Sequence, residues 1–303
     1  MNSKTLISVV GPTAIGKTKL AIVLAQHFST EIVSADSRQF FKEMTIGTAV
    51  PDTDELAAAP HHFIQHKSIL ESYSVGNFEK DALKKLEQLF TEKDIVVMVG
   101  GSGLYVDAVA KGLDNFPAVD SNIREDLNVL FNNKGIIALQ EKLATLDPEY
   151  YNKVDKDNPH RLIRALEVCI GSGKAYSTFL NQEKPKRPFS IITVGIMADR
   201  EIIYDRINTR VDIMVQNGLL EEAKALLEHQ NLNALQTVGY RELFQFFSGD
   251  WTLEFAISEI KKNTRRFAKR QLTWFKRNKD THWVNYDDDS KEIIEAIEDK
   301  LKA

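Results

Sequence analysis

The chain has 303 residues, a formal net charge of −4 at pH 7, and hydrophobic and charged fractions of 43% and 27%. These fractions are ordinary for a soluble globular protein, and no apolar run is long enough to cross a membrane. Cys169 is the only cysteine, which excludes an intrachain disulfide and a cysteine-based metal site. We therefore expect a cytoplasmic protein, with no room for a signal peptide before a first strand that starts at residue 6.

A phosphate-binding loop follows that first predicted strand. Residues 6–10 form a short apolar segment, and Lys19 to Phe28 read as an amphipathic helix. The residues between and around them that match the phosphate-loop motif are Gly11, Pro12, Thr13, Ala14, Ile15, Gly16, Lys17 and Thr18. Backbone N–H groups at a helix N-terminus form an anion site, to which Lys17 adds a cation and Thr18 a hydroxyl that can ligate Mg²⁺. The sequence therefore predicts binding of a molecule that contains a pyrophosphate.

The second predicted strand, Glu31 to Ala35, ends at an acidic residue. Asp36 opens a polar run at the carboxyl end of this strand, which is the edge where open α/β sheets bind ligands. A carboxylate in that place can ligate a metal or accept a proton from a nucleophile. The alternative is a local role in an Asx turn or a helix cap. We interpret Asp36 as the best candidate for chemistry.

The third predicted strand, Asp94 to Val99, runs into a glycine-rich turn that contains Ser102. Nucleotide hydrolases with a phosphate loop usually place an aspartate after such a strand to help hold Mg²⁺. Glycine stands there instead, so routine NTP hydrolysis is poorly supported. Ser102 either contacts a substrate or caps the helix that follows.

The remaining pattern predicts a parallel sheet with a helical insertion. From about Asp114 the alternation of strand and helix stops, and it resumes with a strand at Ser190 to Ile196. The other predicted elements are a loop over 43–60, a helix from Val75 to Glu92 capped by Asn77, helices over 121–131, 135–144, 159–170, 200–216, 218–228, 239–247 and 252–277, a strand over 282–286 and a final helix. The predicted fold class is α/β, with a P-loop NTPase-like core of residues 1–115 and 186–303 and an inserted all-helical subdomain of residues 116–185.

Two smaller groups of side chains are candidates for ligand binding. Arg206 and Arg210 are four residues apart on one predicted helix, so both can face the same anion. Surface pairing with a nearby aspartate is the alternative, which this pattern slightly favours. The histidines of the group at 61, 62 and 66 suggest a metal, but no cysteine or helical spacing supports zinc.

A basic segment near the C-terminus is the strongest local charge asymmetry. Nine basic residues and no acidic residue lie between Lys261 and Lys279. The helical wheel places apolar residues, Ile257, Ile260, Phe267, Trp274 and Phe275, on one side and all nine cations on the other. Solvated helix faces usually mix signs, so this arrangement favours a polyanionic partner such as nucleic acid. Candidate contacts are Arg265, Arg266 and Lys269, and the basic cluster at 160–164 gives modest support.

Taken together, these segments resemble one family, the bacterial tRNA dimethylallyltransferases. The resemblance is carried by residues 11–18, 34–39, 46–49, 60–62, 99–105, 158–168, 238–242 and 268–275, in the order that the family has them. The series covers nearly the whole chain and is specific, although each block alone is weak. Departures are few: Phe40 and Phe41 replace a frequent Val-Tyr, Ser102 replaces a frequent threonine, and Val50 a frequent lysine.

The resemblance implies an activity and a role for each candidate residue. The phosphate loop would hold dimethylallyl diphosphate, and the acceptor would be N6 of the adenosine at position 37, next to the anticodon of tRNAs that read codons beginning with U. Asp36 would be the base, while Mg²⁺ with Thr18, together with Lys17 and Arg210, would stabilise the departing diphosphate. Ser102 would contact the target nucleotide, flipped out of the loop. Residues implied to contact tRNA are Asp36, Ser37, Arg38, Gln39, Ser102, Arg124, His160, Arg161, Leu162, Ile163 and Arg164.

The partners that the resemblance implies are the tRNA anticodon stem-loop and dimethylallyl diphosphate. We expect no membrane partner, and we expect the chain to be a monomer. A small-molecule kinase with a phosphate loop is the second hypothesis, because it needs the same loop and tolerates an aspartate after the second strand. It leaves the basic helix without a purpose. An RNA-binding nucleotide switch is the third, and nucleotide binding at the loop stays open in each case.

Overall fold

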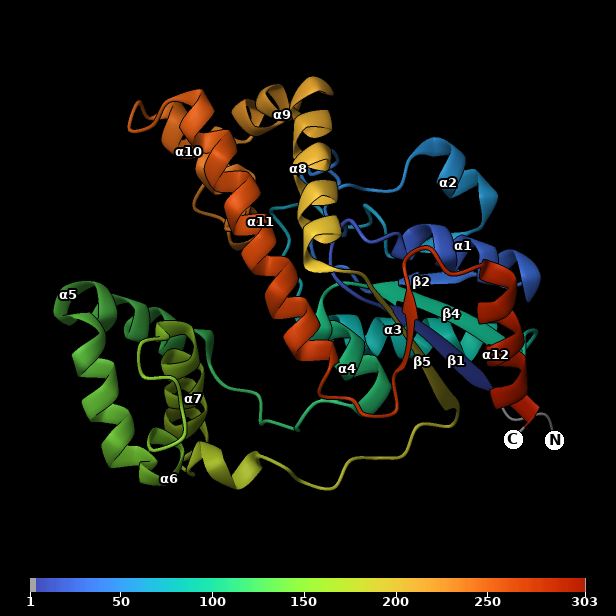
Figure 1. The fold of residues 1–303 in the computed structure, drawn as a ribbon. Helices are drawn as coiled ribbons and strands as arrows, with labels where there is room; N and C mark the ends of the chain where they lie inside the picture. The colour runs from blue at the N-terminus through green and yellow to red at the C-terminus, as the bar shows by residue number, and fades with distance from the viewer. Residues whose placement is uncertain (1–3, 303) are drawn as a thin grey trace. The chain divides into compact units, whose positions relative to one another are not determined.

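Six parallel strands form one sheet in the part of the chain that the computed structural model describes, residues 4–302 (Figure 1). The outermost residues of the predicted core, 1–3 and 303, lie outside this range. The strand order is β3-β2-β4-β1-β5-β6. The strands are β1 (Thr5–Val10), β2 (Ile32–Ser34), β3 (His61–His62), β4 (Ile95–Gly100), β5 (Ser190–Met197) and β6 (His282–Asn285). The predicted α/β class with a parallel sheet is confirmed.

The central position of β1 explains its uniform hydrophobic pattern. It pairs with β4 on one side and β5 on the other, and all six of its residues are buried. Alternate side chains belong to the two hydrophobic clusters of the core, with Leu6 and Val10 in one and Ile7 and Val9 in the other. A parallel strand that helices cover on both faces therefore needs no polar alternation.

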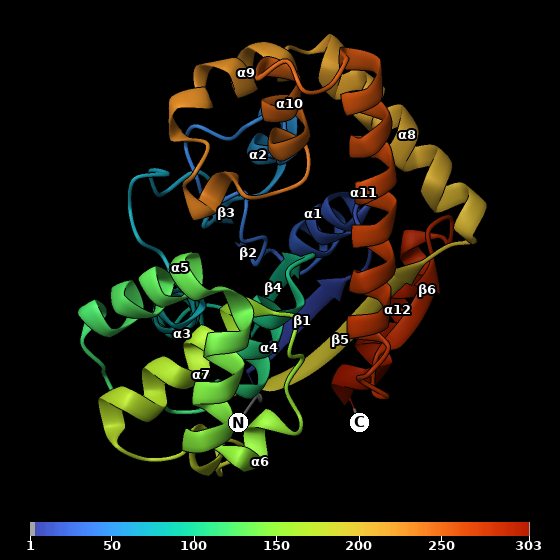
Figure 2. The same ribbon diagram turned by 90° about the vertical axis from the view of Figure 1, so that its left-hand side faces the viewer.

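Helices of the first compact unit, residues 4–111 and 187–302 of the described chain, complete those two clusters. One cluster takes side chains from α1 (Lys17–His27), α8 (Arg200–Gln216) and α12 (Ser290–Lys302). The other takes side chains from α3 (Val75–Leu89), α4 (Gly103–Lys111), α9 (Leu219–Ala225), α10 (Tyr240–Phe247) and α11 (Leu253–Phe275). Figure 2 shows α11 running beside α8. None of the helices in residues 4–302 is long and apolar enough to cross a membrane.

Residues Gly112–Lys186 form a second compact unit without a strand. Its elements are α5 (Ser121–Leu146), α6 (Pro148–Tyr151), α7 (Pro159–Ser172) and the 3₁₀ turn η1 (Tyr176–Phe179). Gly135 breaks α5 with φ 72°, which divides it near the point where two helices were predicted. Leu139, Leu143 and Leu166 lie at its core. Buried Asp147 caps α6 and also accepts hydrogen bonds from Ser177, which fixes η1.

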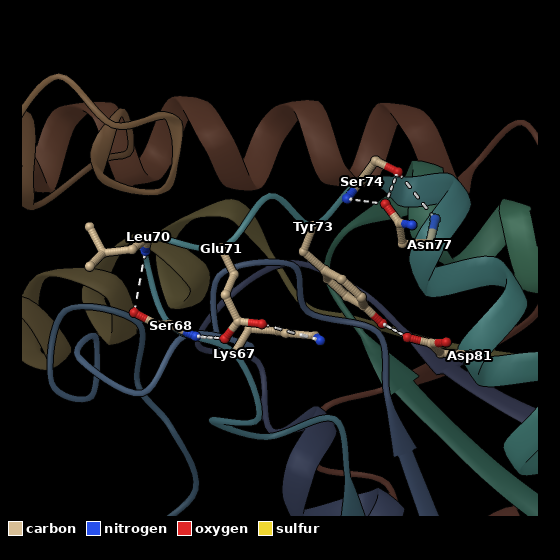
Figure 3. A network of polar contacts seen from close by, with 8 residues as sticks. All are labelled: Lys67, Ser68, Leu70, Glu71, Tyr73, Ser74, Asn77 and Asp81. Atoms are coloured by element: carbon tan, nitrogen blue, oxygen red, sulfur yellow. Dashed lines mark hydrogen bonds and ion pairs between the residues drawn. The ribbon is translucent and has the colours of Figure 1, made fainter. Parts of the chain in front are cut away.

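The loop predicted over 43–60 and the predicted cap of the helix that begins at Val75 are wrong. Residues 43–60 are not entirely loop, because Asp52 caps a short helix, α2 (Thr53–Ala58). The cap of α3 is Ser74 and not Asn77 (Figure 3). Ser74 Oγ accepts from Asn77 N at 3.1 Å, and Asn77 Oδ1 accepts from Ser74 N at 3.0 Å. Asparagine at the third helical position thus completes a capping box of the kind that glutamate or glutamine usually forms.

Two 3₁₀ turns and one irregular segment complete the first unit. The turns η2 (Leu227–His229) and η3 (Asn233–Leu235) follow α9, where one helix over 218–228 was predicted. The helix therefore ends at Ala225, shorter than the sequence pattern indicated. A segment after β3 is pinned by Glu71, which accepts from Ser68 N at 2.8 Å and pairs with Lys67 (Figure 3).

Candidate active site

The phosphate loop connects β1 to α1 at the carboxyl edge of the sheet. Gly16 precedes the first helical residue with φ 107°, a conformation that favours glycine, and no side chain caps the helix. The first N–H groups of α1 are therefore left without a side-chain partner at this end. Lys17 Nζ donates to Pro12 O at 2.6 Å, so the ammonium curls back over the loop.

A cavity of about 650 Å³ opens in front of this loop. Residues from the loop, from the end of β2 and from α8 line it, among them Lys17, Thr18, Asp36 and Arg210. Burial lowers the pKa of Lys17 to about 8, with the charge of Asp36 acting against this shift and that of Arg210 adding to it. Burial also lowers the pKa of Arg210, again opposed by Asp36. A cavity with two desolvated cations is suited to a polyanion.

The two arginines of α8 reach the phosphate loop. Arg206 Nε donates to Ala14 O at 2.8 Å, and Arg210 Nη1 approaches Thr13 Oγ1 at 3.3 Å. Asp212 instead pairs with Lys261 at 2.6 Å. The slightly favoured alternative of surface pairing between these arginines and an aspartate is therefore wrong, because the fold carries this face of α8 across the loop.

Asp36 lies where two cavities meet. It lines the cavity at the phosphate loop and also a second cavity of about 530 Å³. Its Oδ1 accepts from Arg38 N at 3.3 Å, which is the Asx-type contact named above as the local alternative. The local contact and the position in both cavity walls coexist, since a carboxylate has lone pairs for more than one partner.

The second cavity combines cations with aromatic side chains. Its lining residues include Ser102, Tyr105, Arg241, Phe267, Arg270 and Trp274. Trp274 Nε1 donates to Asp107 Oδ2 at 2.8 Å, which orients the indole against α4. A cavity of this size with aromatic faces and guanidinium groups is suited to a nucleotide.

Ser102 directly precedes α4, and its hydroxyl is hydrogen-bonded across the sheet edge. Its Oγ accepts from Ser37 N at 3.0 Å and lies 3.0 Å from Ser37 Oγ. Both serines line the second cavity. The contact of Ser102 with a substrate stays a prediction, and its place in the wall of this cavity is compatible with it.

Arg38 and Gln39 support backbone segments around the cavities. Arg38 Nη1 donates to the carbonyl oxygens of Asn233 and Ala234, at 2.8 and 3.0 Å. Gln39 Nε2 donates to the carbonyl oxygens of Thr48 and Ala49, at 3.2 and 2.8 Å. These two side chains thus hold the cavity walls, besides lining them.

Glu222 on α9 organises the loop over 45–49, and sequence reasoning missed it. Its carboxylate accepts from Thr45 N, Ile46 N and Gly47 N at 2.8–3.0 Å, and from Tyr240 Oη at 2.7 Å. Burial and the charge of Glu222 raise the pKa of Tyr240. Residues 48 and 49 of this loop line both cavities. No local sequence signal marks Glu222, because the three backbone N–H groups that it accepts from lie more than 170 residues away.

Glu222→Ala is expected to displace the loop over 45–49, and with it residues 48 and 49 in the walls of both cavities. Loss of the carboxylate removes the hydrogen bonds that it accepts from three backbone N–H groups and from Tyr240 Oη, at a cost of about 1–3 kcal/mol in the free energy of unfolding. The second-order rate constant for substrate turnover should fall roughly tenfold or more as the loop loses its position. Exposed Glu221→Ala is the matched control. Equal kinetics and equal denaturation midpoints for the two variants would contradict this role.

The basic helix α11 is less uniform than the wheel suggested. Lys261 pairs with Asp212, Lys262 with Glu259, and Arg265 donates to Asn208 Oδ1. Arg266, Lys269 and Arg270 are exposed. The placement of Phe267 on the apolar face is wrong: it is 38% exposed, lines the second cavity and lies 5.7 Å from the guanidinium of Arg270.

In the second unit, the predicted tRNA contacts divide by burial. Leu162 and Ile163 are in the core of the unit, at 0% and 4% exposed, whereas His160 and Arg161 are exposed. Arg124 bonds to Glu167 at 2.7 Å, and Arg164 lies 3.4 Å from the same carboxylate. Side-chain contacts of this helix with a ligand are therefore open to His160, Arg161 and Arg164.

No cluster of three or more potential metal ligands from histidine, cysteine, aspartate and glutamate occurs in residues 4–302. His62 is bonded to Glu31 at 2.5 Å, and His61 Nδ1 to Ala59 O at 2.8 Å. His66 packs against the rings of Phe40 and Tyr73. The zinc interpretation gains nothing from this arrangement.

Comparisons with known proteins converge on one family. Residues 39–278 match the family described as IPP transferase. Two proteins named tRNA dimethylallyltransferase are similar over 99% of both chains: 64% identical in Christiangramia forsetii and 61% in Flavobacterium johnsoniae. A full-length tRNA isopentenylpyrophosphate transferase from Bacillus halodurans has a similar structure, with TM-score 0.74, 36% identity, and 99% and 97% of the two chains covered. A eukaryotic dimethylallyltransferase acting on tRNA gives TM-score 0.81, 26% identity, and 94% and 75% coverage.

Proposed function

The chain belongs to the IPP transferase family, and from this premise we propose how its two cavities divide the reaction. The chain is a prenyltransferase that transfers a dimethylallyl group to tRNA. We propose that the cavity at the phosphate loop holds dimethylallyl diphosphate and that the second cavity holds the target adenosine. The observation that carries this assignment is the position of Asp36, which lines both cavities. The kinase alternative has no support from the relatives.

The proposed chemistry is a displacement at the first carbon of the dimethylallyl group. The exocyclic N6 of adenosine forms a bond to that carbon as the bond from carbon to the diphosphate oxygen breaks. The N6 proton passes to the Asp36 carboxylate, and the electron pair of the broken bond leaves with diphosphate. Lys17 and Arg210, both desolvated, face the charge that develops on the leaving group.

The residues present fit a magnesium ion at the phosphate loop. Thr18 and Asp36 bring oxygen atoms to the wall of the same cavity, and Mg²⁺ in phosphate sites usually takes one or two protein oxygens, with phosphate and water oxygens completing its shell. We propose that Thr18 ligates the ion. When bound, the ion would supply positive charge against the diphosphate oxygens.

We propose that the nucleic-acid partner is the anticodon stem-loop, with adenosine 37 of tRNAs that read codons beginning with U as the target. The second cavity offers Ser37, Ser102 and aromatic faces to a base flipped from the loop. On α11, Arg265, Arg266 and Lys269 would contact phosphates, and in the second unit Arg124, His160, Arg161 and Arg164 would do so. We propose that the chain acts as a monomer.

One incubation tests the function. Wild-type protein receives dimethylallyl diphosphate labelled in the prenyl group, Mg²⁺ and tRNA without the modification. The expected result is label on N6 of the adenosine next to the anticodon, with one diphosphate released per prenyl group. Label that stays in dimethylallyl diphosphate, or that appears only as free prenyl alcohol, would contradict the proposal.

Replacing Arg265, Arg266 and Lys269 by alanine is expected to weaken tRNA binding and flatten its salt dependence. Each lost phosphate contact reduces the slope of log K against log salt concentration by about 0.7–0.9, so three contacts account for roughly 2–3 in all. Filter binding between 50 and 200 mM salt measures the slope. A matched control replaces exposed Lys84, Lys291 and Lys300, which removes the same charge elsewhere. An equal slope for both triple variants would show that α11 carries only solvated charges.

A further inference from the structure

Gln271 on α11 connects the phosphate loop to the turn at Gly101 and Ser102, which we call the serine turn and which lines the second cavity. The residue is 5% exposed, and both ends of its amide are used. Oε1 accepts from Thr13 N at 2.9 Å, and Nε2 donates to Gly101 O at 2.9 Å. Thr13 belongs to the diphosphate cradle, whereas Gly101 directly precedes Ser102. A single side chain from a third element therefore spans the two halves of the site.

The contact between Gln271 and the serine turn is tight. A Cβ atom built on Gly101 would lie 2.4 Å from Gln271 Nε2, so only glycine permits this approach. Both backbone partners would lose a buried hydrogen bond if the amide moved away. The amide thus bridges two loops that begin at the paired strand ends Val10 and Gly100.

The same Thr13 receives a second contact that concerns the leaving group. Its backbone N–H is taken by Gln271, and its hydroxyl meets Arg210 Nη1 at 3.3 Å. A shift of the amide therefore changes the position of the residue against which Arg210 is oriented. Arg210 lines both cavities, so its orientation matters for both substrates.

The helix that carries Gln271 also carries groups exposed to the second cavity. Phe267, Arg270 and Trp274 come from the same stretch of α11 and line that cavity. Ala268 and Phe275, in the same turns, are buried in the two core clusters. A ligand that engages the exposed side of α11 thus acts on the same short segment that holds the amide.

We propose that Gln271 is a positioning residue that couples the two cavities, so that occupation of the RNA cavity changes the affinity of the phosphate loop for diphosphate. This inference rests on the proposed assignment of the second cavity to the target nucleotide. By linkage the effect is reciprocal, and coupling between two sites of one protein is typically 5- to 150-fold in affinity.

The test measures binding of magnesium diphosphate with and without an unmodified anticodon stem-loop RNA, a pair that cannot react. Wild-type protein is expected to show a change in diphosphate affinity of about fivefold or more when RNA is present. Gln271→Glu keeps the shape and the acceptor for Thr13 N but places a carboxylate oxygen against Gly101 O. In this variant the ratio of the two affinities is expected to approach 1, with the thermal unfolding midpoint recorded for each protein.

Two further variants separate the coupling from a loss of fold. Gly101→Ala places a methyl group against the Gln271 amide and should also bring the ratio of the two affinities closer to 1. Gln88→Glu makes the same chemical change as Gln271→Glu on the exposed surface of α3 and should leave the wild-type ratio unchanged. A wild-type ratio of 1, or an unchanged ratio in folded Gln271→Glu, would overturn the coupling. If wild-type protein prenylates tRNA while either result holds, the proposed function survives and only this inference fails.

Discussion

Asp36→Asn is expected to lower the turnover number for prenyl transfer by a factor of about 10² to 10⁴, the range for loss of a positioned general base. The amide is nearly isosteric but cannot take the N6 proton, so the adenine nitrogen would have to lose it to water. Asp36 also places a negative charge near Lys17 and Arg210. Its removal should leave diphosphate affinity equal or slightly higher. The variant therefore distinguishes a role of Asp36 as the base, which changes the turnover number, from a role in binding diphosphate, which changes the affinity.

Single-turnover formation of the prenylated nucleoside measures the first effect, and calorimetry with magnesium diphosphate measures the second. Asp299→Asn, an exposed aspartate on α12, is the control for the change in net charge. A turnover number within threefold of wild type would remove Asp36 from the mechanism. A large loss of diphosphate affinity would instead assign Asp36 to the cradle.

Lys17→Met is expected to reduce the second-order rate constant for dimethylallyl diphosphate by about 10² to 10³, as when one electrostatic donor to a developing charge is removed. Lys17 is half-buried at the loop, and desolvation lowers its pKa to about 8, so its charge is less screened there than in bulk water. Methionine keeps much of the length and the apolar contacts. Because Lys17 interacts most with the leaving group, kcat should fall and the dissociation constant of diphosphate should rise.

The control for this change is Lys291→Met, which removes an exposed cation of α12. tRNA affinity measured without diphosphate should be the same in both variants and in wild type. If Lys17→Met left kcat unchanged and raised only KM, the lysine would bind ground state and transition state equally. Unaltered kcat and KM would show that the loop does not hold the diphosphate.

Local signals were sufficient for much of the site. The phosphate loop is a contiguous motif between a strand and a helix, and Asp36 directly follows the next strand, so sheet geometry alone brings them to one edge. The resemblance to known sequences added the proposed identity of the substrates, which spacing cannot supply. Sequence reasoning did not reveal that Asp36 stands in the walls of two cavities.

Contacts between distant segments were out of reach for the opposite reason. Gln271 bonds to Thr13 across 258 positions, and Glu222 holds a loop about 175 positions earlier. Gln271 lies in a block that carries the family resemblance, but nothing in that block predicts its contact with Thr13, and Glu222 belongs to no such block. The two arginines of α8 show the same limit, because the sequence could not tell anion binding from surface pairing with an aspartate without knowing that the helix lies against the phosphate loop.

The helical wheel of α11 failed at one residue for a physical reason. A helical wheel assigns a single buried face. In the C-terminal half of α11, however, Ala268 and Phe275 pack in the core, whereas Phe267 and Arg270 border a cavity. Phe267 is apolar and faces that cavity. Hydrophobic periodicity cannot distinguish a core contact from the apolar wall of a binding site.

The most direct measurement is a crystal structure of the protein with magnesium diphosphate and an unmodified anticodon stem-loop RNA. We expect diphosphate on Lys17 and Thr18 in one cavity, the flipped adenosine in the other, and its N6 at hydrogen-bond distance, about 2.6–3.2 Å, from the Asp36 carboxylate. A structure with the base bound elsewhere, or with N6 turned away from Asp36 while both ligands occupy the site, would contradict this expectation.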